Sequence, residues 1–159
     1  MDLSKLTTAD KLIAGGGIAY LIFMFLPWYG LDVPGGSVDN SGWDYFLGGI
    51  LPLILILVMV AHVLISAFAP DTKLPDPPLP WGQVHLIAGV AAAVLVVLRL
   101  LIRSDDISGF DLDIDLDRQV GLFLAAVAAI VVAVGGFLKS QESGDARATG
   151  TGSTGSAPF

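Results

Sequence analysis

The stretch FLGGILPLILILVMVAHVLISAFA, residues 46–69, decides the fold of this chain. A helix needs about 20 mostly apolar residues to cross the roughly 30 Å hydrocarbon core of a bilayer. This stretch has 24 residues, and none of them is Asp, Glu, Lys or Arg. It therefore predicts a transmembrane helix.

Three further stretches reach a similar length, at residues 12–29, 83–102 and 120–138. Hydrophobic residues make up 54% of the chain and charged residues 14%, whereas soluble domains carry about a quarter charged residues. We predict an all-α integral membrane protein, a four-transmembrane-helix bundle over residues 12–138. Residues 1–11 form a cytoplasmic tail, and residues 139–159, rich in Gly, Ser, Thr and Ala, are expected to be disordered.

The composition also excludes several classes of function. A net charge of −7 argues against nucleic acid, because phosphate binding needs clustered Lys and Arg. With no Cys in the chain, thiolate metal sites, disulfides and Cys nucleophiles are excluded. G-x-S-x-G and H-E-x-x-H are missing as well. We expect no enzymatic activity and no cofactor.

Lys and Arg counts predict the orientation, since cytoplasmic loops carry the excess of these residues. An inside N-terminus and C-terminus place five of them in the cytoplasm, namely Lys5, Lys11, Lys73, Lys139 and Arg147, and three outside, namely Arg99, Arg103 and Arg118. The first stretch could be a cleaved signal peptide, but no A-x-A-like site follows it. We expect it to remain uncleaved.

Aromatic residues mark the ends of the predicted spans. Trp28 and Tyr29 end the first, Trp43 and Tyr45 precede the second, and Trp81 precedes the third. Their rings favour the headgroup layer of a membrane.

The two outer loops predict a small extracytoplasmic β-cap. Pro34-Gly35-Gly36 has turn chemistry and separates residues 31–33 from residues 37–39. Apolar residues and Asp alternate from Phe110 to Asp117, a strand pattern of period two. Ser41, followed three residues later by Asp44, resembles a capping box before the second span.

The alternating strand would place four carboxylates on one face, those of Asp111, Asp113, Asp115 and Asp117. Weak surface binding of Ca²⁺ or Mg²⁺ is one interpretation. An EF-hand is excluded, because Leu116 and Leu122 stand where Gly and Glu are required. The favoured interpretation is a solvated acidic face, or one that meets a basic partner.

Ionisable residues at membrane depth are candidates for function. His62 and His85 both fall in the cytoplasmic half of adjacent helices. An interhelical hydrogen bond is the plainer role, because every Asp and Glu is expected in a loop or tail. Arg99 and Arg103 share one helix face, where they would pair with the acidic loop or with lipid headgroups.

Small residues repeat every four positions along the fourth span, at Gly121, Ala125, Ala129 and Ala133. Such a stripe lets helices approach closely. It would pack the bundle itself or dock a protein partner or a second copy of the chain. The Pro-rich segment 70–81 is expected to be a stiff connector, with a docking motif as the alternative.

The chain resembles the small four-span membrane proteins of high-GC actinobacteria, whose activity is not known. The resemblance lies in LPWYG (residues 26–30), the Gly-Trp loop before GGILPL and the Gly/Ser/Thr tail. It implies a multi-pass protein of a bacterial cell membrane. Claudin-like tetraspan proteins share the architecture alone, since their outer loop carries paired Cys.

An almost uncharged membrane interior and an acidic outer surface predict a non-enzymatic accessory or scaffold protein of a cell-envelope assembly. The alternative is a small oligomeric transporter or channel, in which His62, His85 or Tyr20 would line a shared pore.

Overall fold

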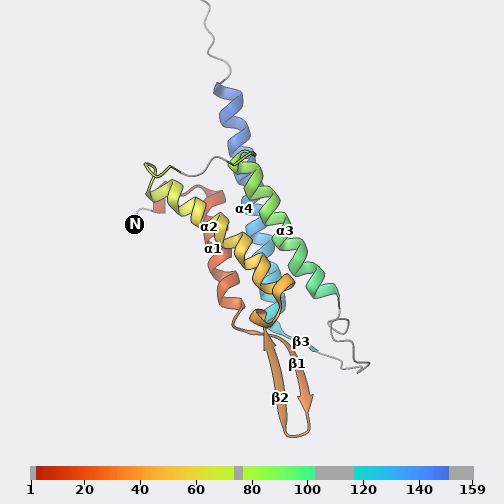
Figure 1. Ribbon diagram of the computed structural model, residues 1–159. Helices are drawn as coiled ribbons and strands as arrows, with labels where there is room; N and C mark the ends of the chain where they lie inside the picture. The colour runs from red at the N-terminus through yellow and green to blue at the C-terminus, as the bar shows by residue number, and fades with distance from the viewer. Residues whose placement is uncertain (1–2, 74–76, 103–116, 151–159) are drawn as a thin grey trace, which may run out of the picture.

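The computed structural model describes residues 3–73, 77–102 and 117–150. Four α-helices run alternately up and down, and a small sheet covers one end of them (Figure 1). The helices are α1 (Thr8–Phe23), α2 (Leu51–Phe68), α3 (Trp81–Leu101) and α4 (Val120–Gly150). We call the end with the sheet the sheet end. The opposite end, where α1 begins and α2 ends, is the terminal end.

Three segments are long and apolar enough to cross a membrane, at Phe46–Phe68, Trp81–Leu101 and Val120–Asp145. Large apolar side chains remain exposed on every helix, among them Ile22, Leu57, Val94 and Val127. Exposed apolar surface of this extent marks a protein that contacts lipid or other proteins. The predicted membrane character is therefore confirmed.

The first helix is shorter than predicted. It has 16 residues and ends at Phe23, so the expected span over residues 12–29 is wrong at its end. Pro27 begins a strand instead, because proline lacks the N–H that a helix needs and disfavours helical backbone at the residue before it. At its start, the Thr7 side chain caps the helix and Asp10 completes the capping box.

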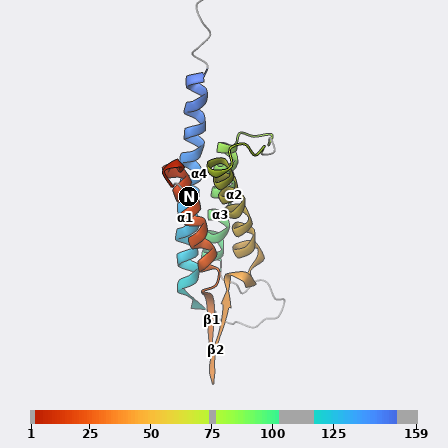
Figure 2. The same ribbon diagram turned by 90° about the vertical axis from the view of Figure 1, so that its left-hand side faces the viewer.

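The predicted β-cap is confirmed as a three-stranded antiparallel sheet. Strand β1 (Pro27–Val33) lies between β2 (Gly36–Ser41) and β3 (Asp117–Arg118). Gly35 turns the hairpin with φ of 109°, a conformation that glycine adopts without strain. Most of the predicted strand 110–117 lies outside the described residues. Figure 2 shows the β1–β2 hairpin extending away from the helices.

Two short turns connect the sheet to α2. The carboxylate of Asp44 accepts a hydrogen bond from the Ser41 N–H at 2.7 Å, which is one half of the predicted capping box, and another from the Ser41 hydroxyl at 3.1 Å. A 3₁₀ turn, Gly42–Asp44, and a π-helical turn, Phe46–Ile50, follow. A side chain at Gly49 would collide with the Gly42 carbonyl, so the close backbone contact depends on glycine.

Helix α4 packs along both α1 and α3 (Figure 1), and small residues of α4 are buried in this contact. Ala125 and Ala129 have no exposed surface. A Cβ at Gly89 of α3 would lie 3.0 Å from the Ala133 Cα, and one at Gly121 would lie 2.8 Å from the Leu26 Cβ. The stripe thus packs the bundle itself. Gly121, Ala125 and Ala129 are buried by this packing and Ala133 is partly buried, and a partner contact through the same stripe stays a prediction.

Helix α4 also continues to Gly150, so the expectation of disorder is wrong for residues 139–150. Its polar part contains its own hydrogen bonds, from the Ser140 hydroxyl to the Phe137 carbonyl and from the Ser143 hydroxyl to the Lys139 carbonyl. An ion pair between Lys139 and Glu142 spans one turn at 3.4 Å. Such i,i+3 pairs stabilise exposed helices. The high Gly and Ser content of the tail indicated disorder instead.

Close helix packing predicts a contrast between two glycines of α4. A Cβ at Gly136 would collide with the His85 carbonyl, whereas one at Gly144 would meet nothing within 4 Å. We expect Gly136→Ala to lower the free energy of unfolding by about 1–3 kcal/mol. The control Gly144→Ala should be neutral or slightly stabilising, because Ala favours helix. Thermal unfolding in detergent micelles measures both, and equal melting temperatures would contradict the packing.

Candidate functional site

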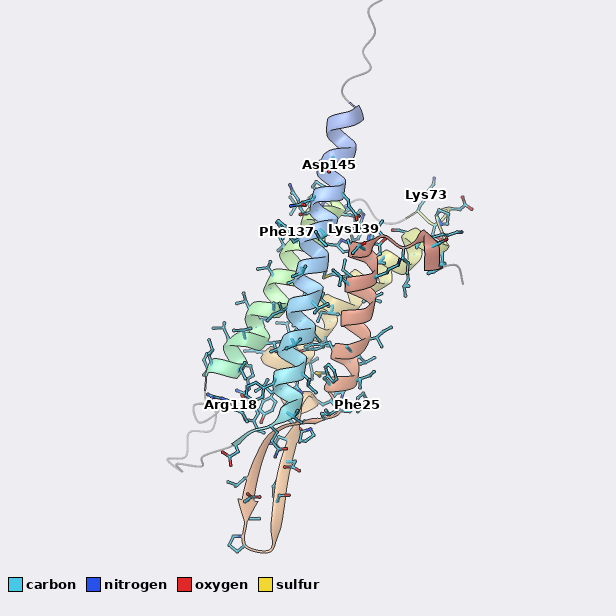
Figure 3. All side chains as sticks on the ribbon, turned by 180° about the vertical axis from the view of Figure 1, so that it is seen from behind. Phe25, Lys73, Arg118, Phe137, Lys139 and Asp145 are labelled. Atoms are coloured by element: carbon cyan, nitrogen blue, oxygen red, sulfur yellow. The ribbon has the colours of Figure 1, made fainter. Side chains whose placement is uncertain are left out.

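Polar and aromatic side chains gather at both ends of the bundle. Arg118 and Phe25 mark the sheet end in Figure 3, and Lys139, Asp145 and Lys73 mark the terminal end. Between these ends the core consists of apolar side chains, including Ile56, Val96 and Leu122. The two clusters are therefore separate.

At the sheet end, the Arg99 guanidinium lies against two tyrosine rings. Its Cζ is 3.9 Å from the Tyr45 ring centroid and 5.0 Å from that of Tyr29. The Tyr29 hydroxyl donates a 2.6 Å hydrogen bond to the Arg99 carbonyl. Cation–π contacts of this kind strengthen when they are desolvated. Tyrosines from β1 and from the segment before α2 thereby fix the start of the sheet to α3.

Trp28 extends this contact toward α1. Its Nε1 donates a 2.9 Å hydrogen bond to the Phe23 carbonyl, and its ring stacks on Tyr45 with 6.4 Å between centroids. The Tyr20 hydroxyl lies 3.3 Å from the carbonyl oxygens of Gly48 and Gly49. Trp28 and Tyr29 are at most 1% exposed. They anchor the hairpin inside the protein, and their place at the level of the headgroup layer stays a prediction.

Sequence reasoning expected Arg99 and Arg103 to pair with the acidic loop. Arg103 and residues 104–116 lie outside the described part of the chain, and so do Asp111, Asp113 and Asp115. Within the described part, Arg99 meets aromatic rings. Asp117 is exposed on β3.

The hairpin beyond this anchor is exposed and acidic. Strand β2 is an edge strand of the described sheet, and Val38 on it is 57% exposed. Among the described residues at the sheet end, the exposed carboxylates outnumber the one exposed cation, Arg118. These carboxylates belong to Asp32, Asp39, Asp44 and Asp117. Asp39 accepts a 2.9 Å hydrogen bond from the Gln119 side chain, which ties β2 to the start of α4.

At the terminal end, the two histidines predicted to be neighbours do meet. The His62 and His85 ring centroids are 4.8 Å apart, and the Trp81 ring stacks on His62 at 3.9 Å. His85 Nδ1 lies 2.7 Å from the Trp81 carbonyl, and a carbonyl can only accept, so Nδ1 donates. The contact between helices is thus ring packing. The His85 ring also lies within reach of the Met59 backbone carbonyl on α2, so the expected interhelical hydrogen bond stays a prediction. His62 Nδ1 is buried without a hydrogen-bond partner among the described residues.

A buried ion pair lies at the same end. Asp10 Oδ1 accepts from Lys139 Nζ at 2.7 Å and is 5% exposed as a residue, while Glu142 lies 3.4 Å from the same ammonium. Burial alone raises the pKa of the Asp10 carboxyl, but Lys139 and the Thr7 cap outweigh it and hold that pKa below its ordinary value of 3.8. We expected every Asp and Glu in a loop or tail, so this pair was missed. The T-x-x-D spacing of Thr7 and Asp10 was the signal that could have found it.

Within the described residues, no group of three or more His, Cys, Asp or Glu side chains could hold a metal ion. No protein-family model matches the chain, and no curated protein or solved structure is significantly similar to it. Any proposal about function therefore depends on the geometry of the two ends.

The Asp10–Lys139 pair predicts a pH-dependent loss of stability. A carboxyl whose pKa is lowered by folding stabilises the protein above its unfolded pKa, and this contribution disappears as pH falls through the folded pKa. The parent should lose stability below about pH 3.8. Asp10→Asn should be less stable at pH 7 by about 1–3 kcal/mol and lack this acid-dependent part.

Melting temperatures in micelles between pH 7 and pH 3 measure the difference between the two proteins. Glu142→Gln, which changes the more exposed partner of Lys139, is the matched control and should behave like the parent. Parallel curves for the parent and Asp10→Asn would show that the ion pair contributes nothing.

Proposed function

We propose that this chain is a four-span protein of the bacterial cell membrane that acts as a non-enzymatic accessory or scaffold subunit. Its termini lie in the cytoplasm, and the acidic sheet end contacts a basic partner outside. The observation that carries the proposal is the β1–β2 hairpin, which is exposed at its tip and fixed at its base by Trp28, Tyr29 and Arg99.

The fixed base matters because a partner that binds a preordered surface avoids the entropy cost of ordering it. The edge of β2 offers backbone groups for strand addition, and the surrounding carboxylates favour a basic partner and disfavour an acidic one. Residues 103–116 follow the same end of α3 and add five Asp to the sequence there.

The proposal counts α1 as the fourth span. Its 16 residues extend about 24 Å at 1.5 Å per residue, which is short of the hydrocarbon thickness. The packing of α1 against α4 supports this assignment, because a neighbouring helix supplies polar partners for the ends of α1. Local thinning of the bilayer accommodates short spans at modest cost.

The alternative, a small oligomeric transporter or channel, finds less support. Tyr20 lies at the sheet end, where its hydroxyl meets two backbone carbonyls, and His62 and His85 lie at the terminal end. Apolar core side chains separate them. A shared path would have to form between copies of the chain.

The scaffold proposal predicts that neutral amides in place of carboxylates at the sheet end disrupt an association without unfolding the chain. Asp32→Asn, Asp39→Asn and Asp117→Asn would be combined, since Asn preserves the acceptor that Asp39 presents to Gln119. The protein would be purified in mild detergent from its native membrane, and a companion identified and quantified by mass spectrometry. We expect a stoichiometric companion with the parent and loss of most of it with the variant.

The matched control combines Asp71→Asn with Asp145→Asn, which neutralise exposed carboxylates at the terminal end, and should retain the companion. Equal retention by all three proteins would overturn the role of the acidic hairpin. A parent that purifies only with itself would contradict the accessory role and favour the oligomeric transporter.

A further inference from the structure

The β1–β2 hairpin at the sheet end has two chemically different faces. Residues that pair directly across a sheet lie on the same face, and successive residues along one strand lie on opposite faces. Gly30 pairs with Asp39 of β2 and with Asp117 of β3. Asp32, two residues after Gly30, pairs with Ser37. The carboxylates of Asp32, Asp39 and Asp117 therefore belong to one face, which we call the acidic face.

The opposite face of the hairpin, which we call the apolar face, exposes valine side chains. It carries Leu31, which pairs with Val38, and Val33, which pairs with Gly36. Val38 is 57% exposed and Val33 is 39% exposed. Because the hairpin extends away from the helices (Figure 2), neither the helices nor the lipid around them would cover its tip.

The outer edge of β2 is open in the described sheet, where β2 pairs with β1 alone. Hydrogen-bonded and non-hydrogen-bonded pairs alternate along an antiparallel ladder, so every second residue of β2 directs its N–H and C=O away from β1. Proteins commonly block such an edge with Lys or Pro, and residues 36–41 contain neither. The one charged residue of β2, Asp39, accepts a hydrogen bond from Gln119. The edge is therefore a template for one more strand.

The two faces determine which sequence such a strand would have. Its backbone would pair with β2 whatever its sequence, but its side chains would alternate between the two faces. Opposite charges on neighbouring strands stabilise a sheet and like charges destabilise it, so the acidic face selects Lys or Arg. A second copy of β2 would bring Asp39 and no Lys or Arg. On the apolar face, Val38 selects an apolar side chain.

We propose that the partner of the sheet end contributes an extended segment that pairs with the edge of β2 and in which basic and apolar residues alternate. Strand β2 has six residues, and the segment matches this length. Its basic side chains lie on the acidic face, and its apolar side chains lie beside Val38. This inference rests on the proposed function and adds to it the sequence class of the partner and its mode of binding.

The first test uses a fluorescently labelled synthetic peptide of the length of β2 in which Lys and Val alternate. It would be titrated with the full-length protein in micelles of an uncharged detergent, and fluorescence anisotropy would measure binding. The control peptide has the same composition, with its Lys and its Val residues in two blocks. We expect the alternating peptide to bind more than about tenfold more tightly, because only alternation places several Lys side chains on the acidic face at once.

Two variants place the same added charge on opposite faces of β2. Ser37→Asp adds a carboxylate to the acidic face and should tighten binding of the alternating peptide by about two- to fivefold. Val38→Asp adds its carboxylate to the apolar face and should not tighten binding. Both positions are exposed, so both variants should melt at the temperature of the parent. Equal tightening by the two variants would show that charge alone attracts the peptide and would overturn the proposal.

A further measurement needs no substitution. Amide hydrogen exchange of the ¹⁵N-labelled parent should become slower at alternate residues of β2 when the alternating peptide is bound, because the added strand pairs with these N–H groups. Failure of this peptide to bind, or binding that leaves the exchange of β2 unchanged, would overturn strand addition. The role of the carboxylates in holding the native companion is decided separately by co-purification, so the two claims can fail independently.

Discussion

The close approach of α1 and α3 to the small-residue face of α4 is the constraint on which the rest of the structure depends. Side chains at Gly16, Gly89 or Gly136 would enter space that facing helices occupy. Without a hydrophobic effect between helices in lipid, such packing is what holds a membrane bundle together. The same approach brings Lys139 to Asp10 at one end and the start of α4 to strand β1 at the other.

The two ends of the packed helix bundle carry different sets of side chains. At the sheet end, aromatic rings surround Arg99 and leave the acidic hairpin free for a partner. At the terminal end, Asp10, His62 and His85 are buried, and Lys139 of α4 pairs with Asp10 while it stays partly exposed. The proposed partner surface therefore lies at the end of the bundle opposite the two histidines.

Much of this fold could be predicted from the sequence, because apolar run length and turn chemistry are local signals. They indicated the helices of residues 46–69, 83–102 and 120–138 and the hairpin around Gly35. The rest depended on contacts between distant residues. The burial of Asp10 at the start of α1 could not be predicted, because its partner Lys139 lies 129 positions away in the sequence. The neighbouring histidines were expected, but the stacking of the Trp81 ring on His62 was not.

The central claim is that the bundle crosses a membrane with its two ends on opposite sides. The chain has no Cys, so single cysteines can report the side on which each segment lies. Ser37→Cys in the hairpin, Lys5→Cys before α1 and Asp145→Cys in α4 would be treated with a membrane-impermeant maleimide on intact cells and again after lysis. The account predicts labelling of Ser37→Cys on intact cells and of the other two only after lysis. Labelling of Ser37→Cys and Lys5→Cys from the same side would contradict it.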